Sequence, residues 1–160
     1  MSQKVVYSGT FDPITLGHVD LVERALCLFD EVIIGVSTGT GKAPLFNLEE
    51  RVELATQVFM GEPRVKIQAF SGLLVDFVSS VGAKAVLRGL RAVSDFEYEF
   101  QMAAINRKLN NQIETIFLAP SEQYTCLSST MIREVAKIDP MRIPDMVHPI
   151  VIEALKLKLS

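Results

Sequence analysis

The chain has 160 residues, a length at which one domain can bury a substantial hydrophobic core. Hydrophobic residues make up 49% and charged residues 22%, and the net charge of −3 argues against nucleic-acid binding, which needs a basic surface. Two cysteines form no disulfide framework, no apolar run approaches a membrane span, and the N-terminus does not resemble a signal peptide, so we expect a cytoplasmic protein with no membrane partner.

The first motif is a turn between a predicted strand and a predicted helix. An apolar run over residues 5–7 predicts a buried strand, and the apolar periodicity of residues 19–29, which includes Cys27 as a small core residue, predicts a helix. Between them lie Gly9-Thr10-Phe11-Asp12-Pro13 and Thr15-Leu16-Gly17-His18. Such loops bind ligands in open α/β sheets, and the N–H groups of a first helical turn favour anions. This context favours a phosphate-facing His18 over a capping or surface histidine.

The next loop carries a candidate cation. Residues 32–36 predict a second buried strand, and Asn47 with Glu50 forms a capping box at the start of a second helix. The loop between them contains Gly39-Thr40-Gly41-Lys42, which resembles a P-loop fragment. A Walker A motif needs Gly at Val36 and Ser or Thr at Ala43, so that motif is absent. Lys42 still follows a strand end, so we interpret it as functional rather than as a solvated surface lysine.

The remaining elements alternate between strand and helix patterns. We expect strands over 65–69, 85–87 and 115–118. We expect helices from a cap at Ser71 to Gly82, from a cap at Ser94 or Asp95 to residue 109, from Ser128 or Ser129 to about 138, and over 149–158. Residues 139–144 are expected to form a loop. Alternating elements predict βαβ units with right-handed crossovers. The expected fold is α/β: one domain over 1–160 with a Rossmann-like, doubly wound, five-stranded parallel sheet.

Two further clusters of polar groups follow predicted strands. Arg88-Gly89-Leu90-Arg91 follows the fourth strand, and guanidinium groups bind phosphate oxygens through paired hydrogen bonds. Gly89 is interpreted as leaving room for a ligand. Glu99 is a solvated helix residue, a ribose ligand or the partner of an arginine. Ser128-Ser129-Thr130 opens a helix after the fifth strand, where hydroxyl groups cap the helix or hold a phosphate.

The combined motifs resemble those of the bacterial phosphopantetheine adenylyltransferases. Gly-Thr-Phe-Asp-Pro with Thr15-Leu16-Gly17-His18 resembles the T/HxGH nucleotidylyltransferase signature, and the more specific matches are Arg88–Arg91 with Asp95-Phe96-Glu97-Tyr98-Glu99, residues 46–51, and residues 127–130. The resemblance covers essentially the whole chain. It implies adenylyl transfer from ATP to 4′-phosphopantetheine, giving dephospho-CoA and pyrophosphate. It also implies Mg²⁺ held mainly by ATP phosphates and water, with no dedicated protein metal site, CoA as a feedback ligand, and a homohexamer.

The same resemblance assigns roles by position. His18, Lys42 and Arg91 are expected to act on the reacting phosphates, with His18 stabilising the transition state. The acceptor substrate is expected to contact Thr10, Lys42, Leu74 and Arg88. ATP is expected to contact Thr10, Phe11, His18, Gly89, Leu90, Arg91, Glu99, Tyr124, Thr125, Cys126, Leu127, Ser128, Ser129 and Thr130. Departures from the family's common pattern are Ser8, Leu16 and Tyr124, and none of them removes a charge.

Alternatives from other functional classes stay open at this point. One is a sister enzyme, such as nicotinate mononucleotide adenylyltransferase or a cytidylyltransferase, and another is a nucleotide-binding sensor without catalysis. The assembly is open too. The helix after Asp95 has apolar residues on more than one face, at Phe100, Met102, Ala103, Ala104 and Ile105. They pack either within the chain or against other copies of it.

Overall fold

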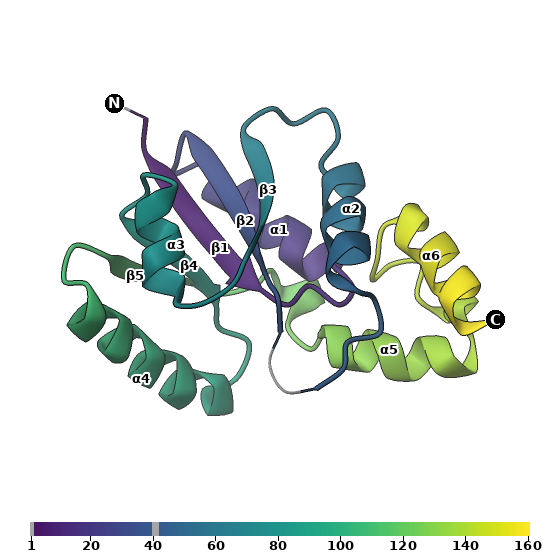
Figure 1. Ribbon diagram of the computed structural model, residues 1–160. Coiled ribbons are helices and arrows are strands. Elements are labelled where there is room, and N and C mark those ends of the chain that lie inside the picture. The colour runs from purple at the N-terminus through teal and green to yellow at the C-terminus, as the bar shows by residue number, and fades with distance from the viewer. Residues whose placement is uncertain (1, 40–41) are drawn as a thin grey trace.

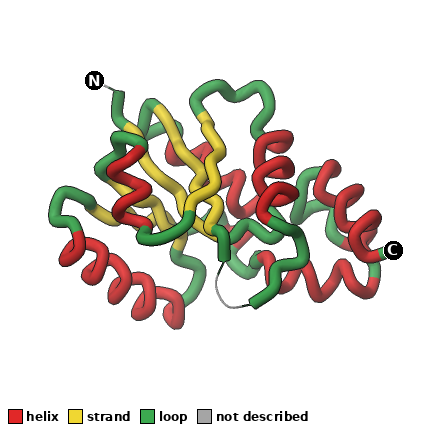
Figure 2. The backbone as a smooth tube through the Cα atoms, viewed as in Figure 1, coloured by secondary structure: helices red, strands yellow, loops and turns green. Residues whose placement is uncertain are grey.

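The computed structural model describes residues 2–39 and 42–160, so Thr40 and Gly41 of the glycine-rich loop lie outside the described residues. Five parallel strands form one sheet in the order β3-β2-β1-β4-β5 (Figures 1 and 2). The strands are β1 (Lys4–Gly9), β2 (Glu31–Ser37), β3 (Val65–Phe70), β4 (Ala85–Gly89) and β5 (Glu114–Leu118). The predicted fold class is confirmed.

Six α-helices and two 3₁₀ turns complete the described structure. The helices are α1 (Leu16–Ala25), α2 (Leu48–Val58), α3 (Leu74–Ser80), α4 (Val93–Leu109), α5 (Ser129–Ile138) and α6 (Pro149–Leu159), and the 3₁₀ turns are η1 (Glu122–Tyr124) and η2 (Pro140–Arg142). None of the described helices is both long and apolar enough to cross a membrane.

The middle of each central strand is apolar because both of its faces are covered. Alternate residues of β1 enter different cores: Val5 and Tyr7 pack with α1, α2, α5 and α6, whereas Val6 packs with α3. On the α3 side, Phe70 and Phe77 stack with ring centroids 4.7 Å apart, and Gly35 leaves the room they need. A Cβ atom at Gly35 would lie 2.8 Å from the Phe77 ring.

The strand order fixes the place of the site. The chain builds outward from β1 through β2 to β3, then returns to place β4 on the other side of β1. This reversal opens a crevice at the carboxyl ends of β1 and β4, where doubly wound sheets bind ligands. In Figure 1, α5 and the loop before α2 lie at that end of the strands, and α4 stands at the edge of the sheet.

Several local predictions were wrong. α3 begins after Leu73 rather than at a Ser71 cap, and α4 begins at Val93, so Ser94 and Asp95 lie inside the helix. Cys27 is exposed because it lies in the turn that follows α1, where Leu26 and Phe29 take the positions against the core. The 139–144 loop contains η2, with Asp139 accepting a hydrogen bond from Met141 N. The caps at Asn47 and Ser128 are confirmed.

Candidate active site

Two adjoining cavities open at the carboxyl ends of β1 and β4. The larger, of about 450 Å³, is enclosed by the β1–α1 loop, the end of the β2–α2 loop, the start of α4 and the 120–133 segment. The smaller, of about 340 Å³, lies between the strand ends and α4. Five residues line both cavities: Ser8, Gly9, Thr10, Arg88 and Glu99. The two cavities therefore meet beside Thr10 and Arg88.

His18 is held by the helix start that it helps to form. Thr15 caps α1, and its side chain accepts a hydrogen bond from His18 N at 3.3 Å. The His18 Nδ1 atom accepts the Thr15 backbone N–H at 2.9 Å, which completes a capping box with histidine in the usual Glu or Gln position. Because Nδ1 is an acceptor, the neutral ring carries its proton on Nε2.

The surroundings of His18 keep its ring neutral. Removal from water, followed by the positive charges of Arg91 and Arg88, lowers the pKa of His18 to about 3. The ring packs edge-on against Phe11 with centroids 4.9 Å apart. Phe11 is buried and has a left-handed backbone with φ of 51°, an uncommon conformation that concentrates at functional sites. His18 is therefore a fixed neutral hydrogen-bond donor on the wall of the larger cavity.

Arg88 and Glu99 form a partly buried ion pair where the cavities meet. Arg88 Nε donates to Glu99 Oε2 at 2.8 Å and Nη2 donates to Oε1 at 2.6 Å, so both carboxylate oxygens face the guanidinium. Nη1 donates to the Ser8 carbonyl at 2.8 Å. These bonds join β4 to β1 and α4, and hydrogen bonding to Glu99 raises the pKa of Arg88. Of the alternatives for Glu99, pairing with an arginine is the one that the structure shows.

Arg91 joins the start of α4 to the segment that leads into α5. Its Nη1 donates to the Leu127 carbonyl at 3.0 Å, and its Nε lies 3.6 Å from Asp95 Oδ2. The same segment is held from the other side by Asp20 on α1, which accepts hydrogen bonds from Ser121 N at 3.0 Å and Ser121 Oγ at 2.7 Å. The 120–133 segment of the cavity wall is thus fixed to both α1 and α4.

The start of α5 faces the β1–α1 loop. Ser128 Oγ accepts the Met131 N–H at 3.1 Å and so caps the helix, whereas Ser129 Oγ donates to the Pro13 carbonyl at 2.8 Å. Arg133, one turn further, donates to the Asp12 carbonyl at 2.6 Å. Sequence reasoning missed Arg133, which lines the larger cavity, although its spacing from the Ser-Ser-Thr run could have suggested it.

Most of the residues predicted for the site gather around these cavities. The larger cavity is lined by Thr10, Phe11, His18, Lys42, Arg88, Gly89, Arg91, Glu99, Tyr124, Leu127, Ser128, Ser129 and Thr130. Leu74 lines the smaller cavity, which extends along α4 past Tyr98, Met102 and Asn106. Leu90, Thr125 and Cys126 are not among the lining residues of either cavity.

Two of the predicted residues differ in detail from their interpretation. Leu90 donates its N–H to the Leu118 carbonyl at 3.0 Å, which continues the pairing of β4 with β5. Gly89 borders the larger cavity, but a Cβ atom there would lie 2.7 Å from the end of the Leu21 side chain. The absent side chain at Gly89 therefore makes room for Leu21 of α1, and the interpretation that it also makes room for a ligand stays a prediction.

The electrostatic balance of the larger cavity is basic. Four cationic residues line it, against three carboxylates: Lys42, Arg88, Arg91 and Arg133 against Asp12, Asp95 and Glu99. Each of these carboxylates lies within 4 Å of an arginine nitrogen. Within residues 2–39 and 42–160, no cluster of three or more His, Cys, Asp or Glu side chains could hold a metal ion. The surplus of positive charge suits an anionic ligand.

Known proteins are similar to this chain in sequence. The cytidylyltransferase-like family matches residues 6–135. Phosphopantetheine adenylyltransferases of Francisella philomiragia and Francisella tularensis subsp. novicida are each 52% identical over 160 residues, which is 100% of this chain and 99% of each relative.

Solved structures share the fold at lower identity. A putative nicotinate-nucleotide adenylyltransferase from Vibrio parahaemolyticus has a TM-score of 0.70 at 18% identity, covering 98% of this chain and 93% of that one. The Plasmodium falciparum nicotinic acid mononucleotide adenylyltransferase also has a TM-score of 0.70, at 14% identity, covering 96% and 94%. These two likenesses concern the fold alone. The full-length identity to the Francisella enzymes decides the family, and the chain belongs to the phosphopantetheine adenylyltransferases.

Proposed function

We propose that this chain transfers the adenylyl group of ATP to 4′-phosphopantetheine, giving dephospho-CoA and pyrophosphate. Relatives with this name are 52% identical over the full length. The structural observation that supports the proposal best is the meeting of two cavities beside Thr10 and Arg88. Two phosphate-bearing substrates have to meet in this reaction, and a basic junction between two binding spaces suits that requirement.

The chemistry asks for positioning rather than for a strong base. An oxygen of the acceptor phosphate attacks the α-phosphorus of ATP, a new P–O bond forms, and the bond to the bridging oxygen of pyrophosphate breaks. The nucleophile is already an oxyanion, so no proton has to be removed. Charge accumulates on the oxygens around the α-phosphorus, and fixed donors and cations stabilise it. In our proposal, neutral His18 donates from Nε2, and Lys42 and Arg91 supply positive charge.

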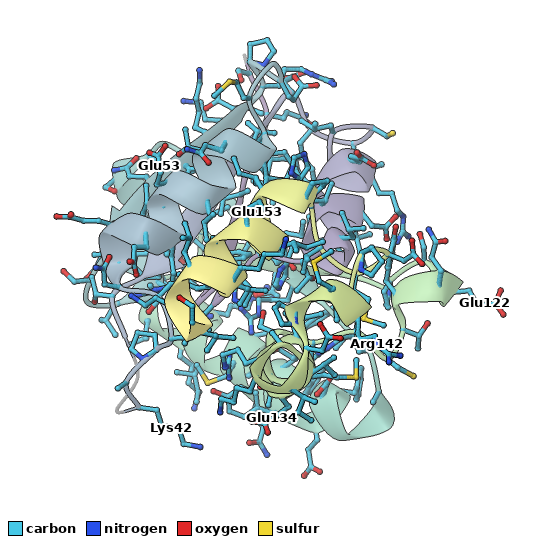
Figure 3. All side chains as sticks on the ribbon, turned by 90° about the vertical axis from the view of Figure 1, so that its right-hand side faces the viewer. Lys42, Glu53, Glu122, Glu134, Arg142 and Glu153 are labelled. Carbon is cyan, nitrogen blue, oxygen red and sulfur yellow. The ribbon has the colours of Figure 1, made fainter. Side chains whose placement is uncertain are left out.

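The proposed acceptor role of Arg88 is limited by its present bonds. Its contacts with Glu99 and Ser8 already use most of its N–H groups. Arg88 can add one hydrogen bond to an acceptor phosphate without breaking the ion pair. Lys42 is exposed and extends from the end of the molecule that carries the β2–α2 loop (Figure 3). We therefore assign Lys42 the larger part in holding the acceptor phosphate.

Mg²⁺ belongs to the proposal as a companion of ATP. It would be held by triphosphate oxygens and water, and it would neutralise charge on the leaving pyrophosphate. The nearby arginines then need only complete that neutralisation. A cytoplasmic setting is also proposed, since the exposed thiols of Cys27 and Cys126 suit a reducing compartment. CoA, which shares the pantetheine arm of the product, is the proposed feedback ligand of the same cavities.

A homohexamer is the proposed assembly. Within the single chain, α4 leaves large apolar side chains exposed, namely Phe96, Tyr98, Phe100, Ile105 and Leu109. Packing within one chain therefore does not account for its apolar pattern. Burying such a surface against other copies is the usual solution for a helix of this kind. The proposed number of six copies comes from the resemblance to the family and not from α4.

A single assay tests the proposed function. The purified chain is supplied with ATP and Mg²⁺, and pyrophosphate release is measured with 4′-phosphopantetheine or with nicotinate mononucleotide as acceptor. We expect pyrophosphate release with 4′-phosphopantetheine as acceptor and none with nicotinate mononucleotide. Turnover with nicotinate mononucleotide would support the sister-enzyme alternative, which the full-length relatives do not favour. ATP binding without pyrophosphate release from either acceptor would support a sensor and contradict catalysis.

A further inference from the structure

Arg51 on α2 is the largest fully buried side chain in the described structure, with 1% of its surface exposed. All of its recorded hydrogen bonds go to backbone carbonyls. Nε donates to Phe46 at 3.1 Å, and Nη1 donates to Thr10 at 2.9 Å and to Ser37 at 2.8 Å. Arg51 therefore joins the β1–α1 loop to both ends of the β2–α2 loop.

Asp12 makes the reciprocal connection from the β1–α1 loop. It is 3% exposed, and its carboxylate accepts two backbone N–H groups of the β2–α2 loop. Oδ2 accepts from Leu45 at 2.8 Å and Oδ1 accepts from Phe46 at 2.9 Å. The Arg133 guanidinium lies 3.7 Å from Oδ2. Asp12 thus fixes the carboxyl end of the loop that carries Lys42, and connects it to α5.

Together the two side chains hold the backbone of one residue, Phe46, on both sides of its Cα atom. Asp12 takes the N–H of Phe46, and Arg51 takes its carbonyl. The β2–α2 loop is therefore anchored at Ser37, where it begins, and at Leu45 and Phe46, where it ends. Lys42 lies between the anchors, and Thr10, which also lines the larger cavity, is bonded to the same Arg51. We call Asp12 and Arg51 the loop brace.

A role in stability alone does not account for the loop brace. Buried charges lose their hydration, and well-packed apolar residues of similar size often stabilise a fold as well or better. Burial lowers the pKa of Arg51 more than the charge of Asp12 raises it, so desolvation outweighs their attraction. The brace partners are backbone groups of the two loops that border the site, although the side chain of Phe46 enters the larger hydrophobic core. Buried polar groups in this arrangement define a loop geometry.

We propose that Asp12 and Arg51 are positioning residues that set the distance between Lys42 and the Thr10–His18 wall of the cavity, and so act on the reaction through Lys42. The proposal rests on the proposed function, because Lys42 is taken to hold the acceptor phosphate. A displacement of about 1 Å at a reacting group can lower a rate by about 10²-fold, so a loop anchor can control activity without touching a substrate.

The test combines three variants with a double-mutant cycle. Asp12→Asn places an N–H donor against a loop N–H. Arg51→Lys keeps the charge but loses the planar guanidinium that donates to three carbonyls at once. Lys42→Ala removes the positioned group. Glu53→Gln is the control: it changes an exposed carboxylate on α2, at the end of the view opposite Lys42 in Figure 3. We expect kcat/KM for 4′-phosphopantetheine to fall about 10- to 100-fold in Asp12→Asn and Arg51→Lys. KM for ATP should change less than about threefold in both, and Glu53→Gln should behave as wild type.

The cycle decides whether the brace acts through Lys42. In the Lys42→Ala background, Asp12→Asn should lower kcat/KM by less than about threefold, because the positioned group is already absent. An equal loss in both backgrounds would overturn the proposal. So would a lower Tm in Asp12→Asn or Arg51→Lys with an unchanged kcat/KM. If the wild-type chain used another phosphate acceptor, the proposed function would fail, and the same cycle with that acceptor would still decide the brace.

Hydrogen exchange in the wild-type chain keeps the proposal testable if a brace variant does not fold. The amides of Leu45 and Phe46 should exchange at least about tenfold more slowly than the amide of exposed Ala43, because the Asp12 carboxylate binds them. Exchange of all three at the same rate would contradict the brace.

Discussion

The Nδ1 atom of His18 lies 2.9 Å from the backbone nitrogen of Thr15 and accepts its hydrogen bond. This one contact links the stability of α1 to the proposed chemistry. It fixes the ring, and it leaves the proton of the neutral imidazole on Nε2. A histidine that completes a capping box is therefore both a structural and a proposed catalytic group, and the two parts can be separated by the choice of substitution.

His18→Ala should lower kcat by about 10²- to 10³-fold, since it removes a fixed donor to the transition state. It should also lower the free energy of unfolding by about 1 kcal/mol, because half of the capping box is lost. His18→Gln is the matched variant, since Gln is a usual residue at this capping-box position. Gln should restore most of the stability but not the rate of His18. A near-normal kcat in His18→Ala would refute the proposed role.

The pH dependence follows from the lowered pKa of His18, about 3 in the folded chain against about 6.5 in an unfolded one. Between these values the unfolded chain binds more protons, so stability is fully present above about pH 6.5 and is lost as the pH falls. From about pH 6.5 to pH 5 this single group lowers the free energy of unfolding by at most about 1.4 kcal/mol per pH unit. His18→Gln should flatten that slope in urea titrations.

A direct reading of the same protonation is available by NMR, because the chain has only two histidines. The imidazole signals of His18 should not shift between about pH 7.5 and pH 5. His148→Gln removes the other set of signals and completes the assignment. A His18 midpoint near pH 6.5 would contradict a neutral donor fixed by its surroundings.

The loops that we assign to phosphate binding could be predicted from sequence because each contains its own local sequence pattern. A strand, a turn with glycine and a helix start place Thr10 and His18 at the binding edge of a parallel sheet, and the same reasoning places Lys42 and Arg91 there. The loop brace could not be predicted in this way. Arg51 lies in a helix with an ordinary amphipathic pattern, and its partners are backbone carbonyls, one of them 41 positions away in the chain.

The start of α4 shows a second limit of sequence reasoning. Ser94 and Asp95 are strong capping residues, yet the helix begins before them, after Ala92. Asp95 instead lies beside Arg91, one turn earlier. The pairing of Glu99 with Arg88 could only be offered as one of three options, because the choice depends on how α4 leans toward β4. Tertiary contacts outweigh local preference at both positions.

Lys42→Ala should raise the dissociation constant of 4′-phosphopantetheine by about tenfold or more and change the affinity for ATP less, because it removes the exposed cation assigned to the acceptor phosphate. Isothermal titration calorimetry with each substrate is the measurement. Lys156→Ala on α6, which removes an exposed lysine paired with Glu153, is the control and should bind both substrates as wild type does. Weakened ATP binding with unchanged acceptor affinity would reverse the assignment.

Arg88→Ala should destabilise the fold by about 3 kcal/mol, because it leaves the partly buried Glu99 carboxylate without its partner. Arg88→Ala combined with Glu99→Gln should recover much of that loss, since no unpaired charge remains. The recovered variant should still use 4′-phosphopantetheine poorly, as it lacks the cation where the cavities meet. Urea denaturation gives the stabilities and steady-state kinetics gives the rest. Full recovery of activity in the double variant would show that Arg88 serves only to neutralise Glu99.

The assembly prediction concerns the exposed apolar side chains of α4. Phe100 is 59% exposed in the single chain and stacks on Phe96 with ring centroids 5.8 Å apart. Since Phe100 contributes little to either core, Phe100→Glu should leave the chain folded but place a charge in the contact between copies. Light scattering at micromolar concentration should give a mass of several times 17.7 kDa for the wild type and a smaller mass for Phe100→Glu. Met60→Glu, at an exposed apolar residue beyond α2, should keep the wild-type mass. A mass near 17.7 kDa for active wild-type protein would contradict the assembly and leave the proposed chemistry unaffected.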